Sequence, residues 1–424
     1  MVIDRNYMTK NNQITALDLG SSKICAIVAE MEEEQQQPRV LGFGLAASEG
    51  IRRGSIVDVE KATAAINRAV SRAEEQSGRS VNTCYVGITG DHIRGMNTVG
   101  RISLIRDARN GAGEIREVES ADVSQVLEHT RSIPLPPDRD ILHVIPQEYI
   151  VDQQSGVKNP CHLAGRRLEA RVHLTTYNTT IVSNITRCLK NINLDVEKLI
   201  LQSLAAAYST VQNDEKELGT VLLDFGAETV DIAVFFRGSI YHTGVVQLGG
   251  ASVTNDLAYL LRIPLEQAEK LKIEHGFASP TQVDKTAEFQ LREYGGSSRT
   301  VPYTLIAEYI EPRLEEIFEA AIHEARKADL PINQKPGLVL TGGGVLQAGL
   351  QQYIEKRFKT SVRIGQPTGF SGCDEELNSP IYSAALGLLK FAIHENQSTE
   401  QNTKAKGFLA RPIGWMKNLI ENVM

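Results

Sequence analysis

The chain has 424 residues, of which 42% are hydrophobic and 23% charged, and this composition excludes a wholly disordered, collagen-like or disulfide-stapled protein. The length predicts two or three domains, and the formal net charge of -7 argues against nucleic acid as a partner. The five cysteines are scattered and no segment is apolar over the roughly 18 residues of a membrane-spanning helix, so we expect a cytoplasmic chain.

The first informative segment, residues 14–28, contains two apolar runs joined by a turn with Asp18 and Gly20, which predicts a β-hairpin. The pattern returns at residues 220–236, with Asp224 and Gly226 in the corresponding places, and indicates an internal duplication. Such turns let backbone N–H groups approach a polyphosphate, and an aspartate at the strand end can hold hydrated Mg²⁺. Either copy alone is more often an ordinary hairpin turn, but the pair predicts two loops that clamp one nucleotide.

A third glycine turn follows a predicted buried strand at residues 337–341. Three glycines, 342–344, lead into a predicted helix at 345–358. A strand, a glycine turn and a helix N-terminus together can bind an anion or a nucleotide. The alternative is a tight turn that needs glycine only for its backbone angles.

These three turns, in this order, resemble the two phosphate motifs and the adenosine motif of the superfamily of actin, the sugar kinases and the DnaK-type chaperones. Residues 141–152, 156–160 and 165–174 then resemble the bacterial cell-division FtsA family. Agreement with that family continues through 215–219, 362–367 and 380–389, so the resemblance covers nearly the whole chain.

The resemblance implies an α/β, actin-like fold with two domains around a nucleotide cleft. The implied divisions are a first domain of 13–83 and 169–210, an inserted small subdomain of 84–168, a second domain of 211–250 and 331–392, and its insert of 251–330. Within the inserts the sequence predicts helices at 120–132, 265–275 and 305–327, the last interrupted by Pro312.

The resemblance also implies which residues contact ATP. They are Asp18, Gly20, Ser21, Ser22 and Lys23 in the first turn, Asp224, Gly226, Ala227 and Thr229 in the second, Glu269 and Lys272 in the insert, and Gly342, Gly343 and Gly344 in the third turn. Asp18 and Asp224 would hold Mg²⁺ through water. Gln202 matches the residue that orients the attacking water in relatives that hydrolyse ATP. The alternatives are a solvated ion pair for Glu269 and Lys272 and an ordinary helix position for Gln202.

One departure from the superfamily pattern affects the chemistry. Ala227 and Glu228 replace two glycines of the second phosphate loop. A carboxylate that faced the site would repel the γ-phosphate, whereas one turned outward would be harmless. We therefore expect ATP binding with weak or no hydrolysis.

The C-terminal segment changes in composition. Residues 393–406 are polar and predict a flexible linker, and residues 407–424 predict an amphipathic helix with Pro412 in its first turn. Its candidate membrane residues are Phe408, Leu409, Ile413, Trp415, Met416, Leu419, Ile420, Val423 and the basic Lys417. This pattern suits a helix in the interface of an anionic membrane, and the alternative is a helix docked on its own domain.

By resemblance, the chain is a peripheral protein on the cytoplasmic face of the inner membrane at the division site. The family tethers the tubulin-like protein FtsZ, whose C-terminal peptide binds the second-domain insert. The first insert serves self-association into dimers or filaments and contacts with later division proteins. A pilus-assembly relative of the same fold and a soluble sugar or acetate phosphotransferase remain alternatives. The phosphotransferase would need a carboxylate base beyond Asp18, Asp224 and Asp231.

Overall fold

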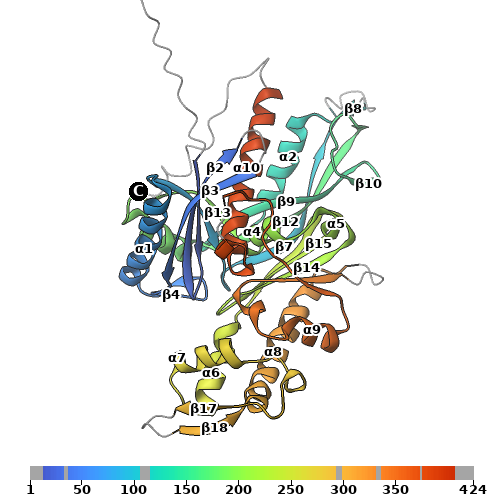
Figure 1. Ribbon diagram of the computed structural model, residues 1–424. Helices are drawn as coiled ribbons and strands as arrows, with labels where there is room; N and C mark the ends of the chain where they lie inside the picture. The colour runs from blue at the N-terminus through green and yellow to red at the C-terminus, as the bar shows by residue number, and fades with distance from the viewer. Residues whose placement is uncertain are drawn as a thin grey trace, which may run out of the picture.

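The computed structural model describes residues 13–32, 37–105, 115–292, 298–330, 336–372 and 375–405. The chain forms two halves around a central cavity, each built on a five-stranded sheet (Figure 1). The fold is the α/β, actin-like fold that the sequence resemblance implies.

The first sheet has the strand order β3-β2-β1-β6-β13. Its strands are β1 Gln13–Leu19, β2 Lys23–Glu32, β3 Gln37–Ala47, β6 Thr83–Ile88 and β13 Asp195–Leu201. Both predicted hairpin strands form here, since β1 and β2 pair antiparallel from Gln13 with Glu30 to Leu19 with Ile24. Strands β6 and β13 run parallel to β1.

The second sheet has the order β16-β15-β14-β19-β20, with the same strand directions as the first. Its strands are β14 Thr220–Phe225, β15 Val230–Phe236, β16 Ser239–Val246, β19 Gly337–Thr341 and β20 Val362–Ile364. An antiparallel three-stranded unit followed by two parallel strands therefore occurs twice, as the predicted duplication requires.

Successive residues of a strand point to opposite faces of the sheet, and the strands of the first sheet bury apolar side chains on both faces. Helices therefore cover both faces. Helices α1 (Val59–Ser77) and α3 (Thr179–Lys190) pack on one face, and α4 (Gln202–Thr210) and α10 (Ser383–Ala405) contribute to the other. Helix α1 begins at the N-cap Asp58, which accepts from the Lys61 amide at 3.1 Å, and ends at Gly78 with a φ of 64°. A small antiparallel hairpin, β4 (Ile51–Arg52) and β5 (Ser55–Ile56), precedes α1.

In its described residues the inserted subdomain has a four-stranded sheet, a two-stranded sheet and one helix. Its elements are β7 Arg94–Ser103, β8 Arg116–Glu117, α2 Ser120–Arg131, β9 Arg139–Val151, β10 Gln154–Val157, β11 Ala164–Gly165 and β12 Arg167–Asn178. The predicted boundaries, 84 and 168, fall inside strands: β6 belongs to the first sheet, and β12 stays in the insert sheet through Asn178. Both predicted points follow polar residues at the start of a strand, Thr83 of β6 and Arg167 of β12, whereas the change of sheet comes after the end of each strand.

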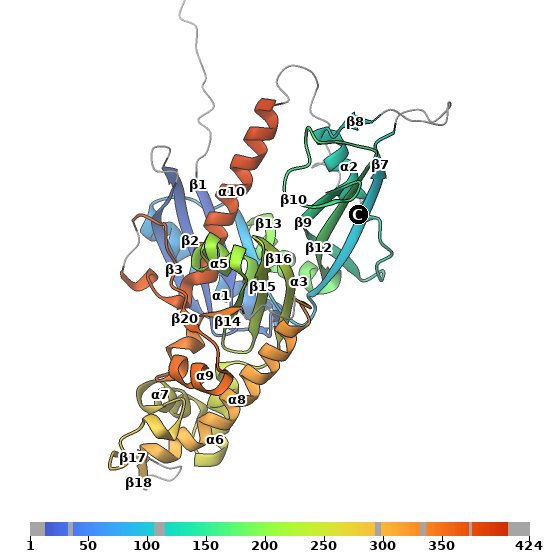
Figure 2. The ribbon, with the colours of Figure 1, turned by 90° about the vertical axis from the view of Figure 1, so that its right-hand side faces the viewer.

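The second half carries its own insert at the opposite end of the molecule from the first (Figures 1 and 2). It contains α6 Gly250–Leu261, α7 Leu265–His275, the 3-10 turn η2 Pro280–Gln282, β17 Glu288–Arg292, β18 Ser298–Pro302 and α8 Tyr303–Arg326. Helix α7 has the predicted bounds, and α8 passes through Pro312 without ending.

The helix predicted at 345–358 divides into two elements. A 3-10 turn, η3 (Gly343–Leu346), precedes α9 (Leu350–Phe358). Gly349 separates them with a φ of 75°, a left-handed conformation that favours glycine and interrupts a right-handed helix. Two further short turns, η4 (Glu375–Leu377) and η5 (Pro380–Tyr382), lead into α10.

The predicted flexible linker at 393–406 is wrong for most of its length, because α10 continues as a helix to Ala405. The first part of α10 is anchored in the core by residues such as Leu386, Leu389 and Ile393. Once a helix is nucleated, each added residue gains a backbone hydrogen bond, and the following Glu, Gln, Lys and Ala residues are good helix formers. The polarity of residues 394–405 therefore did not indicate that the helix ends there.

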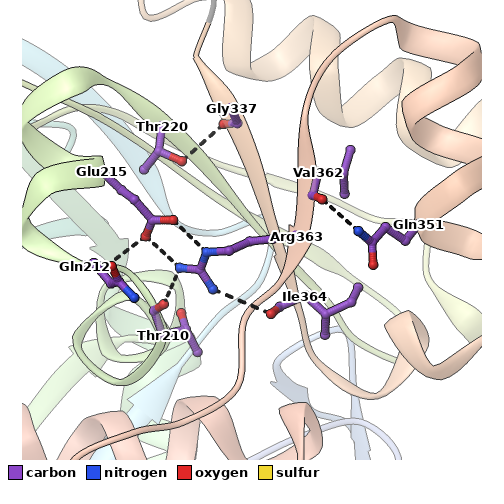
Figure 3. Close-up of polar contacts among 9 residues, drawn as sticks. All are labelled: Thr210, Gln212, Glu215, Thr220, Gly337, Gln351, Val362, Arg363 and Ile364. Carbon is purple, nitrogen blue, oxygen red and sulfur yellow. Dashed lines mark hydrogen bonds and ion pairs between the residues drawn. The ribbon is translucent and has the colours of Figure 1, made fainter.

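The chain crosses from the first half to the second between α4 and β14, through the short helix α5 (Asn213–Leu218). Figure 3 shows the Arg363 side chain of β20 between Glu215 of α5 and the end of α4. Its guanidinium donates to both Glu215 carboxylate oxygens at 2.6 Å and to the Thr210 carbonyl at 2.7 Å. Glu215 also accepts from the Gln212 amide at 2.8 Å, so the crossover is held on both sides.

Candidate functional site

A cavity of about 630 Å³ lies between the two halves. The turn after β1, the turn after β14 and the turn after β19 form its walls together with α6 and α7. It is lined by every residue predicted to contact ATP: Asp18, Gly20, Ser21, Ser22, Lys23, Asp224, Gly226, Ala227, Thr229, Glu269, Lys272, Gly342, Gly343 and Gly344. Gln202 lines it as well.

Close approach of the chain explains why the third turn needs glycine. Gly342 has a φ of 87°, and a Cβ on it would lie 2.4 Å from Asp224 Oδ1. A Cβ on Gly344 would lie 2.6 Å from the ring of Phe225. Gly342 is therefore needed for its backbone angle, as the alternative interpretation has it. Gly342 and Gly344 also let the turn after β19 approach the end of β14 closely at the cavity wall.

Three aspartates make the cavity strongly acidic. Burial raises the pKa of Asp18, although Lys23 and the Gln202 amide oppose the rise. Burial, together with the charges of Asp231 and Asp18, raises the pKa of Asp224 well above its usual range. These carboxylates repel one another, so the site favours a cation or a bound cationic side chain between them.

Asp231 is the third carboxylate of this group. It accepts hydrogen bonds from the Thr89 hydroxyl and, at 3.1 Å, from the Thr229 hydroxyl. Burial raises its pKa to about 7, with the two hydrogen bonds acting in the opposite direction. Thr89, at the end of β6, was not predicted as a site residue because nothing in the local sequence marks it.

Gln202 is the first residue of α4, and its amide donates to Asp18 Oδ1. The side chain is buried, and both residues line the cavity. This position is compatible with orienting a water molecule beside a phosphate. That role stays a prediction.

Lys272 on α7 is mostly buried and donates to Glu269 at 2.7 Å, to the Thr254 hydroxyl at 2.9 Å and to the Gly250 carbonyl at 3.1 Å. The ion pair that was the alternative interpretation therefore forms, but as part of the cavity wall rather than on a fully solvated helix face. Ile273 and Leu346, both largely exposed side chains, also line the cavity. The sequence analysis did not single them out, since isolated apolar residues on helices normally indicate core positions.

Glu228 also lines the cavity, and its Oε2 accepts from the Arg53 backbone amide at 2.7 Å. Arg53 lies in the β4–β5 turn of the first half, so this contact crosses between the halves. The Arg53 guanidinium donates to Gln247 Oε1 at 3.2 Å. The Glu228 carboxylate is therefore hydrogen-bonded to the first half, across the cleft from its own turn.

Comparison with known proteins identifies the family. A family model for the cell division protein FtsA matches residues 221–387, and one for the SHS2 domain inserted in FtsA matches residues 90–176. The chain is 36% identical to the FtsA of Pseudomonas aeruginosa, covering 93% of this chain and 92% of that protein. It is 32% identical to the FtsA of Escherichia coli, covering 97% of each. The chain belongs to the FtsA family of cell-division proteins.

Solved structures agree with the fold of this FtsA-family chain. A type IV pilus biogenesis complex of PilM and PilN superimposes with a TM-score of 0.63 at 15% identity, covering 90% of this chain and 98% of that one. MreB5 of Spiroplasma citri bound to ADP superimposes with a TM-score of 0.54 at 13% identity, covering 92% and 99%. At such identities the likeness extends to the fold alone, so it gives the pilus-assembly alternative no functional support.

Two further expectations concern metal and membrane. Among the described residues no group of three or more acidic, His or Cys side chains is arranged to hold a metal ion, which leaves Asp18 and Asp224 as the predicted pair. No helix in the described part of the chain combines the length and apolarity needed to cross a membrane. The candidate membrane helix, 407–424, lies outside the described residues.

Proposed function

We propose that this FtsA-family chain binds ATP with Mg²⁺ in the cavity between its two halves. The observation that carries the proposal is the convergence of two duplicated hairpin turns and one glycine turn on a single cavity. MreB5 of Spiroplasma citri, whose structure bound to AMPPNP shares the fold at 13% identity and a TM-score of 0.54, supports ATP as the ligand.

The residues present fit such a ligand. Two glycine-containing hairpin turns supply backbone N–H groups for the phosphates, and Lys23 adds a positive charge. Mg²⁺ usually keeps several waters and uses one or two carboxylates besides phosphate oxygens, which suits Asp18 and Asp224. Ile273 and Leu346 offer apolar surface to a base, beside the polar pair Glu269 and Lys272.

Hydrolysis is proposed to be weak. When bound, ATP with Mg²⁺ supplies a reactive γ-phosphoryl group, and we propose Gln202 as the residue that holds a water molecule near it. Against this, the second phosphate turn carries Ala227 and Glu228 where the superfamily pattern has glycines, whose backbone freedom lets the loop close on phosphate.

We further propose that residues 407–424 attach the protein to the cytoplasmic face of the membrane at the division site. There it would bind the FtsZ C-terminal peptide through the 251–330 insert, self-associate, and recruit later division proteins. Family membership supports this role, and the amphipathic pattern of the C-terminal segment supports the attachment.

The nucleotide proposal is tested by titrating the purified protein with ATP in the presence of Mg²⁺ by calorimetry. We expect binding, and a loss of at least tenfold in affinity for Gly342→Ala, because a Cβ there collides with Asp224. Gly156→Ala is the matched control, since Gly156 has a φ of 77° but open space around it and lies outside the cavity. Equal affinities for the two variants would contradict the site.

The tethering proposal is tested by co-sedimentation with anionic liposomes. Full-length protein should sediment with the liposomes and bring FtsZ with it, whereas a variant without residues 407–424 should stay in the supernatant. Unchanged sedimentation of the truncated variant would remove this segment from the proposal.

A further inference from the structure

The second phosphate turn, residues 226–229 between β14 and β15, is hydrogen-bonded to α6 of its own half. The amides of Gly250 and Ala251, at the start of α6, donate to the carbonyls of Gly226 and Ala227 at 3.0 and 2.7 Å. Gly249 approaches so closely that a Cβ on it would lie 2.5 Å from the Ala227 carbonyl oxygen. The turn therefore moves with the second half as one body.

The front of the same turn is joined to the first half at two points. Glu228 accepts from the Arg53 amide, and Asp231, three residues later, accepts from the Thr89 hydroxyl. Because both donors belong to the first half, both bonds lengthen if the halves separate.

The two donors of the first half, the Arg53 amide and the Thr89 hydroxyl, lie in segments that pack against each other. Arg53 and Gly54 form the two-residue turn between β4 and β5, with φ values of 47° and 77°. A Cβ on Gly54 would lie 1.9 Å from the Thr89 carbonyl oxygen, so the turn lies directly against the end of β6. Arg53 and Thr89 thus present their two donors from one packed unit.

We propose that Glu228 is a positioning residue that fastens the second phosphate turn to the Arg53 amide and thereby slows the release of bound nucleotide. The carboxylate stands where the superfamily pattern has glycine, which has no side chain to make the contact. In this chain the residue that departs from the pattern therefore closes the phosphate end of the cleft. The inference rests on the proposed nucleotide site.

The test measures release of a fluorescent ATP analogue after mixing with excess unlabelled ATP, by stopped flow, on the full-length protein with Mg²⁺. Glu228→Ala should release the analogue about tenfold faster than the original protein, the factor expected for one hydrogen bond to a charged group. Glu228→Gln keeps a carbonyl acceptor for the amide and should stay within about threefold of the original rate.

Gln247→Ala is the matched control, because it removes the partner of the Arg53 side chain and leaves the Arg53 amide and Glu228 in place. It should release the analogue at nearly the original rate. The proposal is overturned if Glu228→Ala leaves release unchanged, or if either Glu228→Gln or Gln247→Ala releases as fast as Glu228→Ala.

A second measurement needs no nucleotide. Hydrogen exchange of the Arg53 amide in the nucleotide-free protein should be faster in Glu228→Ala than in Glu228→Gln or the original protein. If no analogue binds at all, the proposed nucleotide function fails, and the exchange result still decides whether the bridge forms. Equal exchange in all three proteins would overturn the bridge itself.

Discussion

At the scale of single residues, the raised pKa of Asp231 predicts how the free energy of unfolding depends on pH. Its pKa is raised from the ordinary 3.8 to about 7, so between these values the folded chain holds a proton that the unfolded chain has released. The free energy of unfolding therefore decreases as pH rises from about 4 to about 7, by an amount on the order of 4 kcal/mol for the full shift. Asp231→Asn should remove this contribution.

The measurement is urea unfolding of the nucleotide-free protein at several pH values in this window. Asp18 and Asp224 have raised pKa values too, so the relevant quantity is the difference between the original protein and the variant. That difference should favour the variant more at pH 7.5 than at pH 5. A difference that does not change with pH would contradict the prediction.

The predictable residues of the site are those whose role is fixed by the backbone. Gly342 and Gly226 occur at turns that any chain of this pattern must make, and Asp18 and Asp224 repeat at equal places in a duplicated hairpin. Thr89 and Arg53 could not be found in this way. Their contacts arise when two distant segments meet, and Arg53 takes part through a backbone amide that carries no sequence signal.

At the scale of secondary-structure elements, the contact between β20 and α5 makes a testable prediction. Burial raises the pKa of Glu215, but the hydrogen bonds from Arg363 and Gln212 outweigh it and the net pKa is lowered. Glu215→Ala should lower the free energy of unfolding by about 2 kcal/mol, since it removes the acceptor for Arg363 and the capping-box bond to the amide of Gln212, the N-cap of α5.

Urea unfolding at neutral pH measures this loss, and Glu217→Ala is the matched control. Glu217 carries the same charge on the same helix, but it is exposed. Its replacement should change the free energy of unfolding by less than about 0.5 kcal/mol. Equal effects of the two substitutions would show that the contact with Arg363 adds nothing to stability.

The bounds of an element could be predicted where residues at both of its ends mark them in the sequence. They could not be predicted where packing between distant segments sets them. Helix α7 has the expected bounds because its amphipathic pattern begins after Pro264 and ends before Gly276. The predicted boundaries of the first insert lie at the polar starts of β6 and β12, whereas pairing between strands, which the local sequence does not reveal, puts all of β6 in the first sheet and all of β12 in the insert. The length of α10 was underestimated because its polar second part extends a helix that its buried first part has nucleated.

At the scale of the whole molecule, the first insert also joins the two halves. Its strands contact the edge strand β16 through a polar network: the buried Gln147 amide donates to the Ile240 carbonyl at 2.9 Å, and the exposed Asn97 amide donates to the Tyr241 carbonyl at 3.0 Å. His173 of β12 lies at its centre, 2.7 Å from Asn97 Oδ1 and 2.8 Å from the Thr243 hydroxyl. These partners assign the ring proton to Nδ1, with Nε2 accepting from Thr243.

Acid should therefore loosen the insert from the second half. Burial, with a smaller contribution from His242, lowers the pKa of His173 from 6.5 to about 3, so in this range the unfolded chain binds a proton that the folded chain does not. Stability then falls as pH drops below 6.5, by about 1.4 kcal/mol per pH unit for this histidine. When the junction opens, the His173 ring can take up a proton, and Nε2 can then no longer accept from Thr243. The protection factors of the β16 amides, which correct exchange rates for their intrinsic dependence on pH, should therefore be lower at pH 5 than at pH 7.5.

His173→Gln separates this effect from general acid unfolding, because its amide can hydrogen-bond within the network but does not titrate. The buried His92 and His143, whose pKa values are lowered to about 4 and about 3, remain in the variant and act in the same direction. The variant should therefore keep part of the acid sensitivity but lose the decrease in protection that is confined to β16. If β16 exchanged equally in both proteins at pH 5, the junction between the insert and the second half would depend on groups other than His173.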